Sequence, residues 1–596
     1  MYKAENISHL FSIDTDLHDL LKKSSNPADA RKKFSQYLDK LADALHDKKH
    51  EMKSLEWLLQ MNCVNTLREI ISLRSEKIAE FNFIEILWNL AREDENLPPD
   101  LSEAFFEDMT NILKGALGKS EVYENQDYPE FMKLEGREAA VERSKDLDHI
   151  ALETIESIKK YPSGLDRDII EKRKHNRSHI LDQLQGNEDD WNSHLWQIRN
   201  VIRNRDQLQR LVDLNDEEEE AIDLAKEHQL PFGITPYYVS LMDQEPHRKY
   251  DHAVRAQVIP PLHYVKKMLE HRENRSYSFD FMHEHDTSPV DLITRRYPQI
   301  LILKPYNTCS QICVYCQRNW EIDDVLMPNA LASKDKIMEA LDWVKNHPEI
   351  TEVLVTGGDP LVMQDSRIHF VLSEIAKVDH VERIRIGSRT PVVLPMRVTD
   401  DLIKLIGEFH LPGKREICLV THFEHPYEIT PESMNAVQKF RKLGISVYNQ
   451  AVFTIENSRK FELVALRRFL RLIGVDPYYS FNTKGKEETK NYRVPMARLQ
   501  QEVKEEARLM PGMIRTDEPV YNVPRLGKNY VRAEQHHTLL TILPDGSRVY
   551  EYHPWEKYLS LTKTYIDRDV PILDYLRELE KRGEDIKQYK TIWYYF

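Results

Sequence analysis

The chain has 596 residues, of which 83 are Lys or Arg and 98 are Asp or Glu, so its formal charge is −15. This acidic balance argues against a nucleic-acid-binding protein, because attraction to phosphate needs a surplus of basic residues. The sequence has no run of ~20 apolar residues to span a bilayer, no apolar signal segment, and cysteines too sparse for a disulfide scaffold. We expect a cytoplasmic protein of roughly two to four folding units that binds neither nucleic acid nor a membrane.

Residues 1–188 form a segment in which apolar side chains recur every three or four positions, as in 27–49 and 81–93. This period is typical of helices with one buried face, and no strand-like run interrupts it. We therefore predict an all-α N-terminal extension that acts as an accessory or oligomerisation domain, in a homo-oligomer. The acidic run at 216–220 is predicted to be the solvated start of a helix, since acidic groups suit the helix dipole there.

From residue 296 onward, short apolar runs alternate with helix-like segments. The runs are 299–305, 351–357, 383–388, 416–422, 446–453 and 477–482, and the later ones start at intervals of 30 to 33 residues. Such alternation predicts βα units around a parallel sheet. Six units favour an open, partial (β/α)6 barrel over a doubly wound sheet, although the period alone does not decide between them. Thr430 is the predicted N-cap of one intervening helix, and Gly444 its stop.

Three cysteines lie close together after the first predicted strand, in the pattern Cys309-x3-Cys313-x2-Cys316. Thiolates suit zinc, copper(I) or iron–sulfur clusters, and a structural zinc site needs four ligands. Cys63 and Cys418 are distant in sequence and are expected to be ordinary buried residues. Four irons held by three thiolates leave one iron open to another ligand. The loops after parallel strands form the active sites of barrels, so this position favours a reactive cluster.

This spacing, followed by a Gly-Gly turn after the second strand, resembles the radical S-adenosylmethionine superfamily. The resemblance implies a 4Fe-4S cluster held by the three cysteines and S-adenosyl-L-methionine bound to its open iron. It also implies an external reductant, such as a flavodoxin or ferredoxin. Gly357, Gly358 and Asp359 occupy the place where that superfamily has a glycine pair contacting the methionine part of the cofactor.

Longer segments resemble the lysine 2,3-aminomutase family in colinear order over about residues 189–550. They are 189–202, 230–243, 295–320, 356–361, 384–399, 421–430 and 521–530. The resemblance implies a helical lead-in at 189–290 and a radical-SAM barrel with a pyridoxal phosphate site at 291–535. A strand and helix tail at 536–596 would follow, with 1–188 outside the family region.

Family members are isomerases that move the α-amino group of an amino acid to C3 and use pyridoxal 5'-phosphate. The resemblance implies that Lys528 carries this cofactor, although the loop from Pro524 is one residue shorter and poorer in glycine than the family's. It implies that Arg318 binds the substrate α-carboxylate. Further cofactor-binding residues implied by the resemblance are Arg296, Tyr297, Arg389 and Gln450. The histidines of His283-Glu284-His285 and of the His422-x-x-His425 motif are expected to pack or hydrogen-bond rather than bind metal.

The substrate prediction depends on two positions where lysine-acting members have aspartates. Lys484 occupies the first; the second is Asn522 or, with a different alignment, Tyr521. A lysine with an amide suits a distal carboxylate, whereas Lys484 would repel the ammonium group of lysine. We therefore predict that L-glutamate is converted to β-glutamate. The alternatives are lysine 2,3-aminomutase activity, on free or protein-linked lysine, and a non-catalytic binding protein that retains the fold.

Overall fold

The computed structural model describes residues 4–47, 49, 52–94, 97–123, 129–245, 250–533, 537–556 and 558–596. The chain forms two compact units. The first comprises 1–155, 493–509 and 528–596, and the second comprises 156–492 and 510–527. Among the described residues, no helix is long and apolar enough to cross a membrane.

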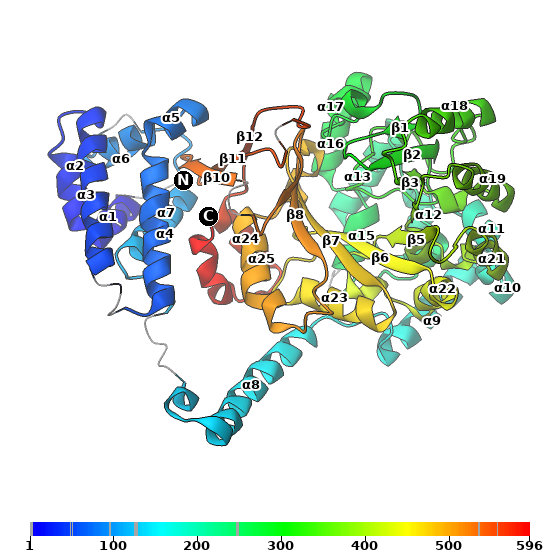
Figure 1. The fold of residues 1–596 in the computed structure, drawn as a ribbon, viewed down its shortest axis with the longest axis horizontal. Helices are drawn as coiled ribbons and strands as arrows, with labels where there is room; N and C mark the ends of the chain where they lie inside the picture. The colour runs from blue at the N-terminus through cyan, green and yellow to red at the C-terminus, as the bar shows by residue number, and fades with distance from the viewer. Residues whose placement is uncertain are drawn as a thin grey trace. The chain divides into compact units, whose positions relative to one another are not determined.

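A mostly parallel sheet forms the centre of the second unit (Figure 1). Its nine described strands follow one another in space in the order of the chain; β1 runs antiparallel to β2, and β2 to β8 run parallel. The strands are β1 (Ile293–Thr294), β2 (Ile300–Tyr306), β3 (Glu352–Gly357), β4 (Arg383–Gly387), β5 (Glu416–Thr421), β6 (Ser446–Val452), β7 (Asp476–Thr483), β8 (Glu518–Val523) and β9 (Gly527–Tyr530). Since strands β2 to β8 are parallel, their carboxyl ends lie at one edge of the sheet.

The six apolar runs predicted as strands correspond to β2 to β7, which confirms the α/β prediction and the parallel sheet. The sequence prediction did not include β8, which pairs parallel with β7. It starts 41 residues after Pro477, outside the regular period of the earlier units. A strand that breaks the period cannot be identified by periodicity.

Helices join and flank these strands. Figure 1 shows α18, α19, α21 and α22 on the outer side of the strands β2 to β6. The bounds are α9 (Arg167–Gln183), α10 (Glu188–Asn192), α11 (His194–Arg199), α12 (Arg205–Leu208), α13 (Asp216–Glu227), α14 (Pro236–Val239), α15 (His252–Val258), α16 (Leu262–Glu270), α17 (Arg275–Ser278), α18 (Lys334–Lys345), α19 (Asp365–Ala376), α20 (Thr390–Val393), α21 (Asp400–Gly407), α22 (Pro431–Lys442) and α23 (Glu462–Leu472).

Local sequence signals explain where several of these helices begin and end. Thr430 caps α22 by accepting a hydrogen bond from the backbone N–H of Ser433, and Gly444 after the helix has a φ of +77°. The acidic run at 216–220 is the first turn of α13, where Asn215 provides the cap. Both helix starts are confirmed, because capping depends on residues next to one another in the chain. The acidic run is not solvated throughout, however, since Glu218 is buried and lies 3.2 Å from Arg255 Nη1.

The first unit is helical over its N-terminal part, as predicted, and it also contains the C-terminal strands. Its helices are α1 (Ala4–Ile13), α2 (Thr15–Lys22), α3 (Pro27–Asp47), α4 (Ser54–Ile70), α5 (Leu73–Ala79), α6 (Phe83–Ala91), α7 (Glu103–Ala116), α24 (Met496–Gln501) and α25 (Ile572–Lys581). Its antiparallel sheet is β10 (His537–Ile542), β11 (Arg548–Tyr552) and β12 (Tyr565–Arg568). Two elements span the division between the units, α8 (Gly136–Ile158) and β9 (Gly527–Tyr530).

The compact units and the four predicted domains divide the chain differently. The predicted boundary at residue 188 falls inside the second unit, and the predicted tail 536–596 belongs with the N-terminal helices. Cys63 and Cys418 are both buried and unbridged, as expected.

Candidate active site

The three clustered cysteines lie on the loop after β2, at the carboxyl edge of the sheet. The backbone N–H of Val314 donates to the carbonyl of Gln257 at 2.7 Å, which attaches this loop to α15. Burial raises the pKa of the Cys309 and Cys316 thiols. The three cysteines are half-buried, and such thiols ionise readily only if a metal or cation compensates the charge, so the loop suits a metal centre.

The glycine pair after β3 packs against the start of this cysteine loop. Gly357 has a φ of +114°, and a Cβ on Gly358 would lie only 2.1 Å from the carbonyl oxygen of Thr308. Gly358 N–H donates to the Tyr306 carbonyl at 2.8 Å, and Asp359 N–H donates to that of Thr308 at 2.9 Å. The glycines therefore let two backbone segments meet. Contact of this pair with the cofactor stays a prediction from the sequence.

Asp359 organises the neighbouring loop after β4. Its buried carboxylate accepts hydrogen bonds from Ser388 Oγ at 2.7 Å, Arg389 N at 2.9 Å and Thr390 N at 3.0 Å. A carboxylate that accepts this many hydrogen bonds has little capacity left for a cofactor. In this structure Asp359 orients the loop that carries Arg389.

Arg389 places its guanidinium group beside the cysteine loop. Its Nη1 lies 2.8 Å from Cys313 Sγ, its Nε donates to the carbonyl of His422 at 3.1 Å, and its Nη2 lies 2.6 Å from Glu428 Oε1. Burial, together with the charge of Arg389, lowers the pKa of His422 to about 4. His422 Nδ1 contacts the backbone carbonyl of Gln450 on β6 at 3.0 Å. These contacts bring two predicted site residues, Arg389 and Gln450, to one end of the sheet.

Arg318 and Arg296 lie in a buried cluster of charges with Glu284. Arg318 Nη2 is 2.9 Å from Glu284 Oε1, and Arg296 Nη2 is 3.5 Å from the same oxygen. Among the described residues, Arg296 Nε and Nη2 are buried donors without a hydrogen-bond partner. Such donors suit an anion with several oxygens, so this arginine fits the phosphate of pyridoxal phosphate. Its neighbour Tyr297 is half-buried.

Lys484 follows β7 and is buried, with 1% of its surface exposed. Its backbone N–H donates to the carbonyl of Asn522 at 3.0 Å, and its Nζ lies 5.7 Å from the centre of the Tyr521 ring. Asn522 and Tyr521, the two residues predicted as possible partners of Lys484, therefore both lie beside it on β8. Lys484 does not point into solvent, although it lies in a strongly charged stretch of sequence.

Several charged residues of the site were not predicted from the sequence. Lys486 is buried and pairs with Glu488, which accepts a hydrogen bond from Asn319 Nδ2 at 2.9 Å. Lys304 pairs with Glu284 across 3.6 Å. A charged run such as 484–490 is normally solvated, so only tertiary contacts reveal these buried pairs.

Lys528 lies in β9 and is half-buried. Lys528 belongs to the first compact unit, whereas the cysteine loop belongs to the second. Each is therefore described by the contacts within its own unit. The assignment of Lys528 to the cofactor stays a prediction from the sequence.

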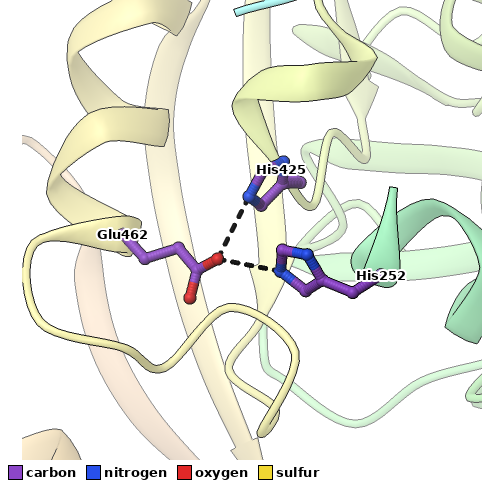
Figure 2. Close-up of side chains that lie close together, drawn as sticks. All are labelled: His252, His425 and Glu462. Atoms are coloured by element: carbon purple, nitrogen blue, oxygen red, sulfur yellow. Dashed lines mark hydrogen bonds and ion pairs between the residues drawn. The ribbon is translucent and has the colours of Figure 1, made fainter. Parts of the chain in front are cut away.

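A second cluster of potential metal ligands lies elsewhere in the second unit (Figure 2). His252, His425 and Glu462 bring one ligand atom each within 4.8 Å of one another. However, Arg459 Nη2 lies 2.6 Å from Glu462 Oε1 and 2.9 Å from His252 Nε2. The guanidinium group supplies the positive charge that a metal would bring, so we interpret the cluster as a structural network.

Buried polar atoms around the strand ends fit an additional polar ligand. Ser310 Oγ, Thr390 Oγ1 and Thr421 Oγ1 have no hydrogen-bond partner in the part of the chain that the structure describes. They belong to the cysteine loop and to the ends of β4 and β5, where S-adenosylmethionine is expected. Because unpaired buried hydroxyls are unfavourable, these positions are consistent with a bound cofactor.

Comparison with known proteins identifies the family. Residues 303–466 match the model of the radical SAM superfamily. The chain is 44% identical to an uncharacterized KamA family protein, MJ0634 of Methanocaldococcus jannaschii, over 100% of this chain and 99% of that one. It is 34% identical to the glutamate 2,3-aminomutase of Clostridioides difficile, over 59% of this chain and 79% of the relative.

The L-lysine 2,3-aminomutase of Clostridium subterminale is 35% identical over 52% of this chain and 70% of that relative. Radical SAM proteins use a 4Fe-4S cluster with S-adenosylmethionine and need a reductant, in agreement with the three cysteines of the loop. The chain belongs to the KamA family of the radical SAM superfamily, which includes these lysine and glutamate 2,3-aminomutases.

Proposed function

We propose that the protein is a pyridoxal phosphate-dependent 2,3-aminomutase that converts L-glutamate to β-glutamate. The observation that carries the choice of substrate is the burial of Lys484 beside Asn522 at the carboxyl edge of the sheet. A buried ammonium group attracts a distal carboxylate and repels a distal ammonium group. The relative that acts on glutamate, by its name, supports the same class of reaction.

Different residues would bind the substrate and each of the cofactors. Cys309, Cys313 and Cys316 would hold the cluster, Arg318 the α-carboxylate of the substrate, and Arg296 the phosphate of the cofactor. Lys528 is the residue that the sequence offers for covalent attachment of pyridoxal phosphate. When bound, the cluster and S-adenosylmethionine supply a radical that abstracts hydrogen from C3, and pyridoxal phosphate supplies the group that holds the migrating nitrogen.

The protein's own side chains would orient the amino acid by its two ends. A guanidinium fork at Arg318 matches the planar α-carboxylate, and Lys484 matches the distal one. Arg389 adds positive charge next to Cys313. Burial of these groups excludes water, which strengthens their attraction for the carboxylates and protects a reactive radical.

The direct test is product formation by the anaerobically reconstituted enzyme. The reduced protein is incubated with S-adenosylmethionine, pyridoxal phosphate and either L-glutamate or L-lysine, and the β-amino acids are separated and quantified. We expect β-glutamate. Formation of β-lysine without β-glutamate would overturn the choice of substrate, and the absence of both products would overturn the aminomutase proposal.

Replacement of Lys484 isolates its contact with the substrate. Lys484→Met removes the charge while keeping most of the side-chain volume, so we expect kcat/KM for glutamate to fall roughly 30-fold or more. Lys490→Met is the matched control, because Lys490 lies in the same segment and is exposed. Equal loss in both variants, or no loss in either, would contradict a contact between Lys484 and the distal carboxylate.

A further inference from the structure

Glu284 lies in a short motif between two histidines, and its carboxylate is held in one position by the turn around it. Only 1% of its surface is exposed. Its backbone N–H donates to Asp280 Oδ1 at 2.8 Å, and that of His285 donates to Asp280 Oδ2 at 3.1 Å. Ser288 Oγ donates to the Glu284 carbonyl at 2.8 Å. The turn is therefore fixed on both sides of Glu284, and its side chain points into the protein.

The carboxylate contacts Arg318 at two points. Arg318 Nε donates to Glu284 Oε2 at 3.1 Å, and Nη2 lies 2.9 Å from Oε1. The second contact is an ion pair, since Glu284 Oε1 accepts no hydrogen bond among the described residues. The hydrogen bond at Nε and the charge attraction at Nη2 together restrain the guanidinium group. Arg296 Nη2 and Lys304 Nζ reach the same carboxylate at 3.5 and 3.6 Å.

The surrounding positive charges keep Glu284 ionised. Burial by itself would raise the pKa of Glu284, but Arg318, Arg296 and Lys304 lower it to about 2. Glu321 is a second carboxylate of this cluster: it pairs with Lys304, and its Oε2 is 3.7 Å from Arg318 Nε. Three cations facing two carboxylates leave a net charge of +1, so the cluster still attracts anions after Glu284 has been counted.

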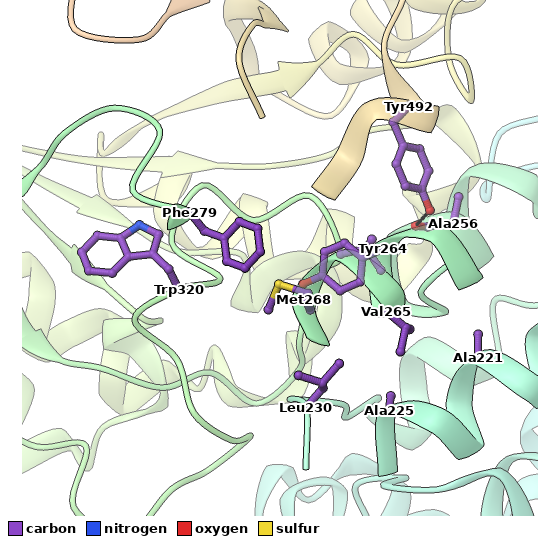
Figure 3. Close-up of a cluster of buried hydrophobic side chains, with 11 residues drawn as sticks. Ala221, Ala225, Leu230, Ala256, Tyr264, Val265, Met268, Phe279, Trp320 and Tyr492 are labelled. Atoms are coloured by element: carbon purple, nitrogen blue, oxygen red, sulfur yellow. Dashed lines mark hydrogen bonds between the residues drawn. The ribbon is translucent and has the colours of Figure 1, made fainter. Parts of the chain in front are cut away.

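An apolar cluster stabilises both segments that carry these charges. Phe279, next to Asp280, and Trp320, two residues after Arg318, are buried members of one cluster with Tyr264 and Met268 (Figure 3). Close packing of this kind holds backbone segments in a defined arrangement. The carboxylate and the guanidinium group therefore meet on a rigid base.

We propose that Glu284 is a positioning residue that orients Arg318 toward the substrate α-carboxylate and Arg296 toward the cofactor phosphate. This inference rests on the proposed function for the roles of the two arginines. Glu284 itself touches neither substrate nor cofactor. It acts through the geometry of the guanidinium groups, which must be correct within a fraction of an ångström for two-point binding of an anion.

Glu284→Gln separates positioning from simple neutralisation of charge. If Glu284 only neutralises the arginines, the variant binds anions more tightly, because one negative charge has been removed from the site. If Glu284 positions them, loss of its hydrogen bond from Arg318 Nε and of its ion pairs with both arginines weakens binding. We expect KM for glutamate and Kd for pyridoxal phosphate each to rise roughly 10- to 100-fold. The Kd is measured by absorbance titration of the reconstituted protein without amino acid.

Two further variants complete the experiment. Glu284→Asp keeps the charge and shortens the side chain. A positioning role predicts that KM for glutamate and Kd for pyridoxal phosphate rise again, whereas simple neutralisation predicts wild-type values of both. Glu284→Asp also serves if Glu284→Gln does not fold, as judged by thermal unfolding. Asp286→Asn is the matched control, because Asp286 lies in the same turn with its side chain 56% exposed. We expect wild-type KM and Kd from it.

The possible outcomes distinguish this inference from the proposed function. Unchanged or tighter binding of both ligands by the Glu284 variants of an active enzyme would overturn the positioning role. A wild-type protein that forms no β-amino acid would overturn the proposed function instead. In that case the Kd for pyridoxal phosphate is the only test of the positioning role. Equal values for wild type and Glu284→Gln would overturn that role as well.

Discussion

Glu424 is a buried carboxyl group, 3% exposed, at the carboxyl end of β5. Burial raises the pKa of Glu424 to about 8, although Arg389 and the hydrogen bond that Glu424 Oε2 accepts from Val452 N at 2.7 Å act against the rise. The folded protein therefore binds a proton at neutral pH that the unfolded chain releases near pH 4.5. The contribution of Glu424 to the free energy of unfolding is therefore most favourable at low pH.

A change in pH between these two values should reveal the contribution of Glu424 to stability. The free energy of unfolding falls as pH rises from about 4.5 to 8, because the folded state binds more protons than the unfolded state in this window. Glu424→Gln cannot titrate, so its stability relative to wild type should improve by roughly 3 kcal/mol between pH 5.5 and 8. Denaturant unfolding at both pH values measures this, and a constant difference would contradict the raised pKa.

At the scale of the elements, the end of β3 is in direct backbone contact with the cysteine loop after β2. The Gly358 N–H bonds to Tyr306, and the backbone next to Gly358 leaves no room for a side chain against Thr308. Since Thr308 immediately precedes Cys309, any change in this contact moves the first thiol of the site.

Gly358→Ala should displace the cysteine loop. The new Cβ would lie 2.1 Å from Thr308 O and 2.4 Å from Thr308 N, so backbone must shift. We expect destabilisation of roughly 1–3 kcal/mol and a lower iron and sulfide content after anaerobic reconstitution. Gly512→Ala is the control, because no atom of the described residues lies within 4 Å of its Cβ position. A full complement of iron in Gly358→Ala would show that the contact does not hold the loop.

At the scale of the whole molecule, the first compact unit is assembled from distant parts of the chain. Arg548 on β11 forms a two-point ion pair with Asp108 on α7, at 2.9 and 2.7 Å, and both side chains are almost completely buried. The same guanidinium group donates to the carbonyls of Trp593 and Tyr595. One arginine thus joins the N-terminal helices to the C-terminal tail.

Breaking this buried pair should destabilise the first unit. Asp108→Asn leaves the buried guanidinium group without its counter-charge, and the expected loss is about 3–5 kcal/mol. Glu103→Gln provides the control, since Glu103 and Arg577 join the same two parts of the chain but are 44% and 46% exposed. We expect a change of about 0–1 kcal/mol there. Thermal unfolding measures both, and similar losses would contradict the role of burial.

Local patterns account for much of what could be predicted. Strands β2 to β7 were predictable because each repeats an apolar run of similar spacing, and the cap at Thr430 because the signal lies within a few residues. Strand β8 broke the period and was missed. Glu284 was noticed only as part of a histidine motif, since its role depends on Arg318, which lies 34 residues away.

The amino-acid sequence by itself determined the helical N-terminal part, the parallel sheet and the three thiols on one loop, because these depend on periodicity and on neighbours along the chain. The tertiary structure alone decided that Lys484 and Lys486 are buried, that Glu284 lies between two arginines, and that the C-terminal strands belong with the first helices. Burial and charge pairing between distant residues arise only when the chain folds, and no local pattern records them.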